Sequence, residues 1–153
     1  MTVATPLLLF VCTGNICRSP MAEAIAAHEA IRAGIKLRVA SAGTAAMEGH
    51  GAHDFARDAL MPLGLDVQSH RAQQITRELV ADATLVVTAT KRQRDDLHYF
   101  FPHVSEKIVS FDDATGLGEL TDPYGDGASA FAKTADVLRA GMPRIFSIVA
   151  GRP

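Results

Sequence analysis

The chain has few cysteines and no long apolar run, which argues against a disulfide-rich secreted protein and against a membrane-spanning protein. Its 153 residues include two cysteines, Cys12 and Cys17, too few for the disulfide framework of a small secreted domain. The longest apolar runs, around residues 7–12 and 85–87, fall well short of the roughly 20 residues that cross a bilayer. No basic segment precedes the first run, so a signal peptide is not expected. The sequence therefore predicts a cytoplasmic protein.

A strong excess of charge of one sign is also missing. The formal net charge is −2, which argues against nucleic acid or an anionic membrane as the main partner. The length predicts a single domain over residues 1–153, with one sizeable core. We expect this domain to be a monomer or a weak dimer.

The most informative stretch is VCTGNICRSP, at residues 11–20. The apolar residues 7–11 predict a short buried strand that leads into it. Ser19 offers a capping hydroxyl and Pro20 suits the first position of a helix, so a helix is expected to begin at about Ser19. The residues between form a tight connection from strand to helix.

This connection has the chemistry of an anion site. Gly14 and Asn15 accept positive φ readily, so several N–H groups of the loop can turn toward one point. The helix that follows directs its free N–H groups and its positive dipole end to the same point. Arg18 adds a planar fork that holds two phosphate oxygens at once. Cys12 is expected at the floor of this cradle, where the nearby positive charge favours a thiolate nucleophile.

The pattern V-C-x-G-N-x-C-R-S-P resembles the loop of the low-molecular-weight protein tyrosine phosphatases. The resemblance agrees with Cys12 as nucleophile and Arg18 as phosphate clamp, and it implies neither a metal nor a cofactor. The expected phosphate-binding loop consists of Thr13, Gly14, Asn15, Ile16, Cys17, Arg18 and Ser19.

A second motif, TDPYG at residues 121–125, is by itself typical of a turn. In the phosphatase family an Asp-Pro-Tyr sequence lies over the active site, and its aspartate is the general acid. The resemblance therefore implies that Asp122 protonates the leaving phenol and then activates water, while Tyr124 packs against the substrate ring. The expected intermediate is a cysteinyl-phosphate on Cys12, with the hydroxyl of Ser19 stabilising the departing thiolate.

Two residues have both a structural and a functional interpretation. His70 is explained equally well as a structural histidine, but the resemblance implies that it supports the phosphate loop by orienting Asn15 and Ser19, without transferring a proton. Cys17 is either a small buried residue or a thiol that traps oxidised Cys12 as a reversible disulfide, and the family pattern favours the second reading.

Residues 44–52 are expected to form a loop beside the site. The walls of the substrate pocket are expected to come from Met47, Glu48, His50 and Tyr124. Gly125 stands where some family members have a second aromatic residue, which predicts a more open cleft. His50 and His53 lie three positions apart without a convincing further ligand, so no metal site is expected.

Strands alternate with helices along the chain. Further strands are expected at residues 37–41, 84–88 and 107–111, and helices at 20–33, 53–63, from 76, at 91–100 and at 129–148. Alternation predicts a parallel sheet covered on both faces, with ligands beyond the carboxyl ends of its strands. The resemblance implies the same α/β class: a single-domain four-stranded flavodoxin-like fold. Residues 112–120 are expected to be a loop, Phe100 to point inward, and Pro143 to kink or break the last helix.

Three other activities match parts of this pattern. Arsenate reductases of the same fold use two further cysteines after the third strand, where this chain has none. A non-catalytic phosphate-binding module is expected to lack Cys12 or Asp122. Protein-arginine phosphatases have a similar loop, but with a hydroxyl residue at the position of Ile16. A branched alkyl group tolerates an aromatic ring better than a guanidinium, so phosphotyrosine is favoured. The expected partner is a phosphotyrosine-bearing protein, with a bacterial tyrosine kinase as one candidate.

Overall fold

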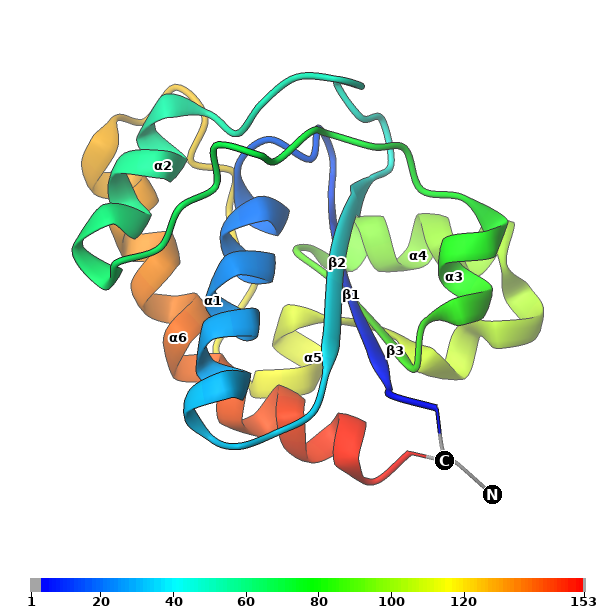
Figure 1. Cartoon of the computed structure of the whole chain (residues 1–153). Helices are drawn as coiled ribbons and strands as arrows, with labels where there is room; N and C mark the ends of the chain where they lie inside the picture. The colour runs from blue at the N-terminus through cyan, green and yellow to red at the C-terminus, as the bar shows by residue number, and fades with distance from the viewer. Residues whose placement is uncertain (1–3, 153) are drawn as a thin grey trace.

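A four-stranded parallel sheet forms the centre of the protein (Figure 1). The computed structural model describes residues 4–152, so the ends of the expected domain, residues 1–3 and 153, lie outside the described residues. The strands are β1 Leu7–Cys12, β2 Arg38–Gly43, β3 Leu85–Thr88 and β4 Ile108–Ser110. Their order in the sheet is β2-β1-β3-β4, and all pairs are parallel. The predicted fold class is therefore confirmed.

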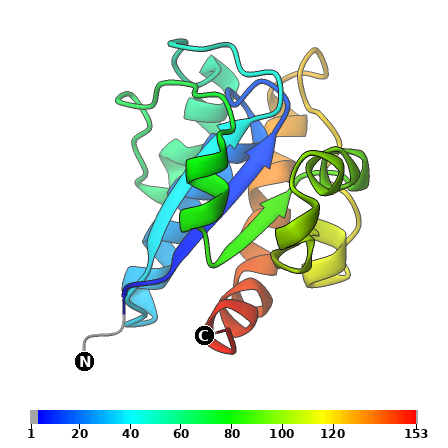
Figure 2. The same cartoon turned by 90° about the vertical axis from the view of Figure 1, so that its right-hand side faces the viewer.

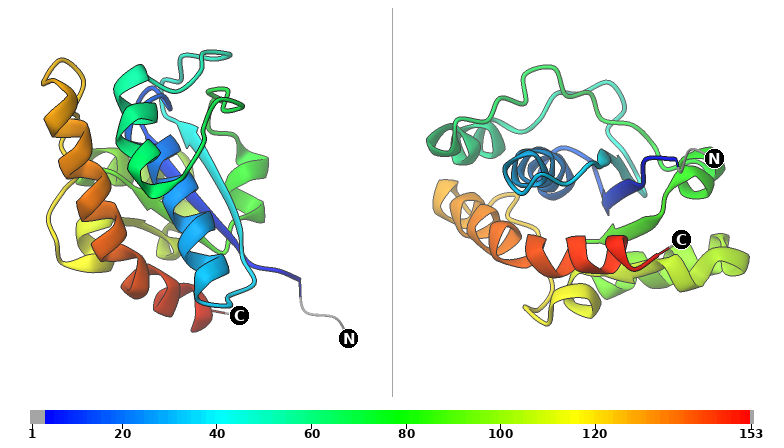
Figure 3. Two further views of the ribbon diagram at one scale, coloured as in Figure 1. Left: turned by 60° about the vertical axis from the view of Figure 1, so that its left-hand side comes forward. Right: turned by 60° about the horizontal axis from the view of Figure 1, so that its bottom comes forward.

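Helices cover both faces of this sheet. The helices are α1 Arg18–Arg32, α2 Asp54–Leu60, α3 Arg77–Asp82, α4 Lys91–Phe100, α5 Phe111–Thr115 and α6 Ala128–Ala150, with short 3-10 turns η1 Met61–Leu63 and η2 Pro102–Lys107. The right-hand view of Figure 3 shows α1, α2 and α6 on one side of the sheet, and α3 and α4 on the other. Figure 2 shows the same layers from the side of α3.

Strand β1 is buried on both faces, which explains its uninterrupted apolar sequence. Leu8, Phe10 and Cys12 belong to the core beneath α1 and α6, whereas the alternate residues of the strand face the smaller core beneath α3 and α4. Cys12 is the last residue of this central strand and pairs with Gly43 at the end of β2. The loops that follow β1 and β2 therefore meet at one end of the sheet (Figure 1).

The start of α1 differs from the prediction. Arg18 is the first helical residue and Cys17 is the N-cap, without a side-chain capping bond. Ser19 does not cap the helix because its hydroxyl lies inside the first turn, where it bonds to Cys12 and Asn15 instead. Asn15 has a positive φ of 59°, as expected, but Gly14 does not. One left-handed residue therefore suffices to turn the loop.

Three further expectations concern elements away from this loop. The predicted loop at residues 112–120 was wrong in its first part, because Ser110 and Asp113 form a capping box that starts α5. Phe100 is 68% exposed, since Leu97 takes the inward position of α4. Helix α6 continues through Pro143 without a break, and it bends in its second half (Figure 1).

Candidate active site

The backbone carbonyl groups of the loop between β1 and α1 point outward and accept hydrogen bonds from neighbouring segments. The carbonyl oxygens of Cys12, Thr13, Gly14 and Ile16 accept from the N–H groups of Thr44, Ala45, Met47 and His53, at 2.8 to 3.0 Å. The carbonyl of Asn15 lies 2.7 Å from Nε2 of His70, and that of Cys17 accepts from Met21 within α1. Because C=O and the following N–H point in opposite directions across a trans peptide, these contacts turn the N–H groups of residues 13–18 into the loop. The result is a ring of donors that suits an anion.

Arg18 and Cys12 lie at this ring and are both buried. Cys12 is 2% exposed and Arg18 is 5% exposed. Nη1 of Arg18 donates to the carbonyl of Leu120 at 2.9 Å, which fixes the guanidinium against the start of the Asp122 loop. Among the described residues, Nε of Arg18 is a buried donor without a hydrogen-bond partner. Such a donor is expected where an anion binds.

A chain of buried side chains supports the cysteine from below. Oγ of Ser19 lies 2.9 Å from Sγ of Cys12, and Asn15 donates to Ser19 at 2.8 Å. When Cys12 is a thiolate it can only accept, so the hydroxyl of Ser19 donates to it. Asn15 also donates to Ser41 at 3.0 Å, and Ser41 donates to Glu23 at 2.6 Å. Because Asn15 donates to Ser19, the hydroxyl proton of Ser19 can go to the sulfur at 2.9 Å or to the carbonyl of Ala42 at 3.4 Å, and the shorter contact favours the thiolate.

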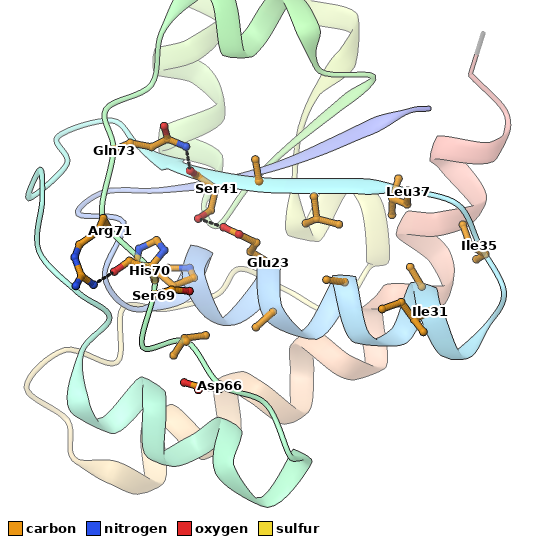
Figure 4. A pocket seen from close by; sticks show the side chains of 17 residues that line it. Glu23, Ile31, Ile35, Leu37, Ser41, Asp66, Ser69, His70, Arg71 and Gln73 are labelled. Atoms are coloured by element: carbon orange, nitrogen blue, oxygen red, sulfur yellow. Dashed lines mark hydrogen bonds between the residues drawn. The ribbon is translucent and has the colours of Figure 1, made fainter. Parts of the chain in front are cut away.

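His70 lies beside Asn15, one of the two residues that it was expected to orient, and among the described residues it makes no hydrogen bond to the other, Ser19. Its Nε2 is 2.7 Å from the Asn15 carbonyl, so the ring donates from this nitrogen. The N–H of Gln73 donates to Oδ1 of Asn15 at 2.9 Å, and Nε2 of Gln73 donates to the Ser41 carbonyl. Figure 4 shows Ser41, His70 and Gln73 at the polar end of a groove between α1, β2 and residues 66–73. The same segment thus holds both the backbone and the side chain of Asn15.

Four residues that hold the loop by hydrogen bonds were not predicted from the sequence: Glu23, Ser41, Gln73 and Gln93. Gln93 is buried in the first turn of α4, where it completes a capping box with Thr90 and donates to Oγ1 of Thr13 at 3.0 Å. By their local sequence these are ordinary polar residues, and only the fold shows that the loop is within their reach.

The Asp122 loop closes one side of a cleft above the ring. Oδ2 of Asp122 lies 3.8 Å from Nη2 of Arg18, and Oδ1 accepts from the N–H of Tyr124 at 3.1 Å. The cleft has a volume of about 270 Å³, and its walls include Ile16, Met47 and Tyr124. The side chain of Asp122 is 55% exposed, so it is open to solvent and to a substrate.

Two of the expected wall residues lie outside this cleft. Met47 and Tyr124 line it, whereas Glu48 and His50 do not, and Ala45 takes part instead. The chain turns away after Met47: Gly49 has a φ of 82°, and the carbonyl of His50 accepts from Ala72 at 2.8 Å. Glu48 and His50 are exposed residues outside the cleft, so their predicted role as its walls was wrong.

The second cysteine lies in the same ring but in a different environment. Burial raises the pKa of Cys17 to about 12, and the negative charges of Asp122 and Cys12 add to the effect while Arg18 opposes it. Cys17 is therefore a thiol at neutral pH. Both cysteines are free.

Among residues 4–152, no group of three or more histidine, cysteine, aspartate or glutamate side chains is arranged to hold a metal ion. Within the same residues, every helix is too short or too polar to cross a membrane.

Comparison with known proteins gives a consistent result. The model of the family described as low molecular weight phosphotyrosine protein phosphatase matches residues 7–151. A probable low molecular weight protein-tyrosine-phosphatase, EpsP of Ralstonia nicotianae, is 32% identical over 143 residues, covering 90% of this chain and 94% of EpsP. A protein-arginine-phosphatase of Bacillus subtilis is 34% identical over 133 residues, covering 86% of this chain and 88% of that protein.

Solved structures resemble the chain along nearly its whole length. The low molecular weight protein tyrosine phosphatase of T. tengcongensis has a TM-score of 0.89 at 34% identity, covering 94% of this chain and 99% of that one. A mutant of the arginine phosphatase YwlE, with a phosphorylated active-site serine, has a TM-score of 0.88 at 30% identity, covering 95% and 96% of the two chains.

Proposed function

Because the chain belongs to the low molecular weight phosphotyrosine protein phosphatase family, we propose that it hydrolyses phosphotyrosine in proteins through a phosphorylated Cys12. The family consists of hydrolases that include tyrosine and arginine phosphatases. One observation carries the proposal: Cys12 lies in a ring of inward N–H groups, beside a buried Arg18 whose Nε has no partner among the described residues. This arrangement suits attack on a bound phosphate.

The first step transfers the phosphoryl group to the enzyme. The N–H groups of residues 13–18 and the guanidinium of Arg18 stabilise the charge on the three equatorial oxygens. The thiolate of Cys12 attacks phosphorus, so that an S–P bond forms as the bond to the aryl oxygen breaks. Asp122, protonated at this stage, gives its proton to that oxygen, and the product leaves as a phenol.

The second step releases phosphate. Asp122 is now a carboxylate and takes a proton from a water molecule, whose oxygen attacks phosphorus. The S–P bond breaks and Cys12 returns as a thiolate. The hydroxyl of Ser19, 2.9 Å from the sulfur, donates to this thiolate, while Asn15 holds the hydroxyl in place. No step requires a cofactor.

Ile16 favours phosphotyrosine over phosphoarginine. The cleft beside the ring is lined by Ile16, Met47 and Tyr124, which offer apolar contact to a flat aromatic group. A guanidinium needs hydrogen-bond acceptors that an isoleucine side chain lacks. Since relatives with both activities are similar to this chain, phosphoarginine remains the second candidate substrate.

The proposal extends to partners, compartment and redox response. The substrate is a phosphotyrosine-bearing protein, and a bacterial tyrosine kinase is a candidate. The free thiols of Cys12 and Cys17 suit a reducing compartment such as the cytoplasm. If peroxide converts Cys12 to a sulfenic acid, the thiol of Cys17 condenses with it to give a disulfide and water, which protects the nucleophile.

The test is hydrolysis of p-nitrophenyl phosphate by wild type and by Cys12→Ser, with EDTA present and pH varied from acid to neutral. We expect turnover by wild type and none by the variant. Phosphotyrosine and phosphoarginine peptides then identify the substrate. Cleavage of phosphoarginine alone would replace the proposed substrate, and no turnover by folded, reduced wild type would reject the mechanism.

A further inference from the structure

His53 lies where the phosphate loop, α2, α6 and the Asp122 loop come together. Its backbone N–H donates to the carbonyl of Ile16 at 2.8 Å, so it is attached to the phosphate loop. Its side-chain Nδ1 accepts from the N–H of Phe55 at 3.0 Å and caps α2. Because Nδ1 accepts, the proton of the neutral ring is on Nε2. These two bonds fix both the backbone and the ring of His53.

The fixed ring is packed among three aromatic side chains. It stacks on Phe131 of α6, with centroids 4.8 Å apart and an interplanar angle of 23°. It meets the ring of Tyr124 edge to face at 5.6 Å and 81°, and it also contacts Phe55 at 5.4 Å. His53 does not line the cleft itself, but its ring contacts Tyr124, which does.

The ring of His53 is an aromatic contact that Tyr124 makes outside its own loop. Tyr124 is 62% exposed, and its backbone N–H donates to Oδ1 of Asp122 in the same loop. The N–H of Asp126 likewise donates to Pro123. These bonds set the shape of the loop at residues 121–127, but neither of them joins Tyr124 to Ile16, which also lines the cleft. The ring of His53 links the two walls.

We propose that His53 is a positioning residue that sets the width of the aryl slot between Ile16 and Tyr124. This inference rests on the proposed function, in which the aromatic ring of the substrate lies beside Ile16 and Tyr124. It assigns to His53 no contact with the phosphate, and therefore predicts separate effects on aryl binding and on phosphate binding.

The experiment compares wild type with His53→Asn, His53→Phe and Thr76→Ala. Asparagine retains a capping acceptor but removes the ring, while phenylalanine retains a ring but removes the acceptor. Thr76 caps α3 through the N–H of Leu79 and serves as the matched control for loss of a cap. The measurements are kcat and KM for p-nitrophenyl phosphate, the inhibition constants of phenylphosphonate and inorganic phosphate, and the melting temperature.

In His53→Asn, we expect KM and the inhibition constant of phenylphosphonate to rise about threefold to tenfold. This is the change in affinity that corresponds to the free energy of one aromatic pair. The constant for inorganic phosphate should stay at the wild-type value, and kcat should change less than about twofold. His53→Phe should recover aryl binding while melting earlier, as Thr76→Ala does.

Unchanged aryl constants in His53→Asn would overturn the inference. A parallel rise in the phosphate constant would overturn it too, because His53 would then act on the phosphate loop itself. If wild type hydrolyses no aryl phosphate, the proposed function fails, but calorimetry with the same two ligands still decides the role of His53. A preference for phenylphosphonate that His53→Asn abolishes supports it, and an equal ratio in both proteins rejects it.

Discussion

The two loops that meet at the cleft are built in different ways. The phosphate loop is buried, with Asn15 fully covered and Arg18 5% exposed, and groups outside the loop hold its carbonyls in place. In the loop at residues 121–127, Asp122 and Tyr124 are largely exposed, and the side chains of Arg18 and His53 reach it from the rest of the protein. The loop proposed to bind phosphate is thus held by many hydrogen bonds, while the loop with the proposed acid, Asp122, is held by few contacts.

This contrast predicts that changes in the Asp122 loop alter turnover without altering phosphate binding. In Asp122→Asn, we expect kcat to fall about 10²- to 10⁴-fold because the general acid is lost. The loss should be larger for phenyl phosphate than for p-nitrophenyl phosphate, whose leaving group needs less protonation. Steady-state kinetics with both substrates measures the difference.

The matched control for this prediction is Asp126→Asn, in an exposed residue of the same loop. It should leave kcat close to the wild-type value. A large rise in the phosphate inhibition constant of Asp122→Asn would contradict the separation between the two loops.

Changes that push the phosphate loop out of place should alter both binding and turnover. A Cβ on Gly43, at the end of β2, would collide with the carbonyl oxygen of Thr13. In Gly43→Ala, we expect kcat to fall about 10- to 100-fold, since small displacements of reacting groups are costly. Phosphate should bind more weakly, and unfolding should require about 1 to 3 kcal/mol less. Kinetics, phosphate inhibition and urea unfolding measure these effects.

Gly51→Ala is the control for this change. A Cβ on Gly51 meets its nearest neighbour, Nη1 of Arg71, at 3.7 Å, which is an ordinary contact. If Gly43→Ala behaves like Gly51→Ala, the close approach of β2 to the phosphate loop does not control the site.

The choice of substrate should depend on the side chain at position 16. In Ile16→Thr, we expect the ratio of phosphoarginine to phosphotyrosine cleavage to rise about tenfold, because a hydroxyl offers a hydrogen bond that an alkyl group does not. Ile16→Val has nearly the same shape without the hydroxyl and serves as the control. An equal ratio in both variants would show that shape alone determines the preference.

The smallest predicted effect concerns stability at alkaline pH. Burial raises the pKa of Cys17 from 9.0 to about 12 in the folded protein. Since the folded pKa is raised, the stabilisation is complete below pH 9.0 and is lost as the pH rises toward 12. At pH 10, wild type should have lost up to about 1 kcal/mol more than Cys17→Ala. Urea unfolding of both proteins at pH 7 and pH 10 measures the difference; equal losses would refute it.

Parts of the site could be predicted because their signals are local. The apolar run of β1 predicts a central buried strand, and the loop after it has an asparagine that tolerates positive φ and an arginine that holds phosphate. The helix α5 was also within reach, because Ser110 and Asp113 have the spacing of a capping box. The loop prediction at residues 112–120 was therefore wrong even though the sequence contains the capping signal.

Other parts depend on residues that are distant in the sequence. Ser41, Gln73 and Gln93 support the phosphate loop from 26 to 80 positions away. Each is an ordinary polar residue by its local context, so its role cannot be assigned before the strands are in register. His53 is a similar case, since the sequence suggested at most a metal ligand and its aromatic contacts come from α6 and the Asp122 loop.

The sheet follows from the hydrophobic pattern, and the family and the loop from Cys12 to Arg18 follow from residue types at fixed short spacing. The fold was needed to show that Glu48 and His50 turn away from the cleft, that Ser19 bonds to the sulfur instead of capping the helix, and that the ring of His53 contacts Tyr124. A hydrogen bond or a ring contact depends on distances of a few ångströms, and packing of segments remote in the sequence sets those distances.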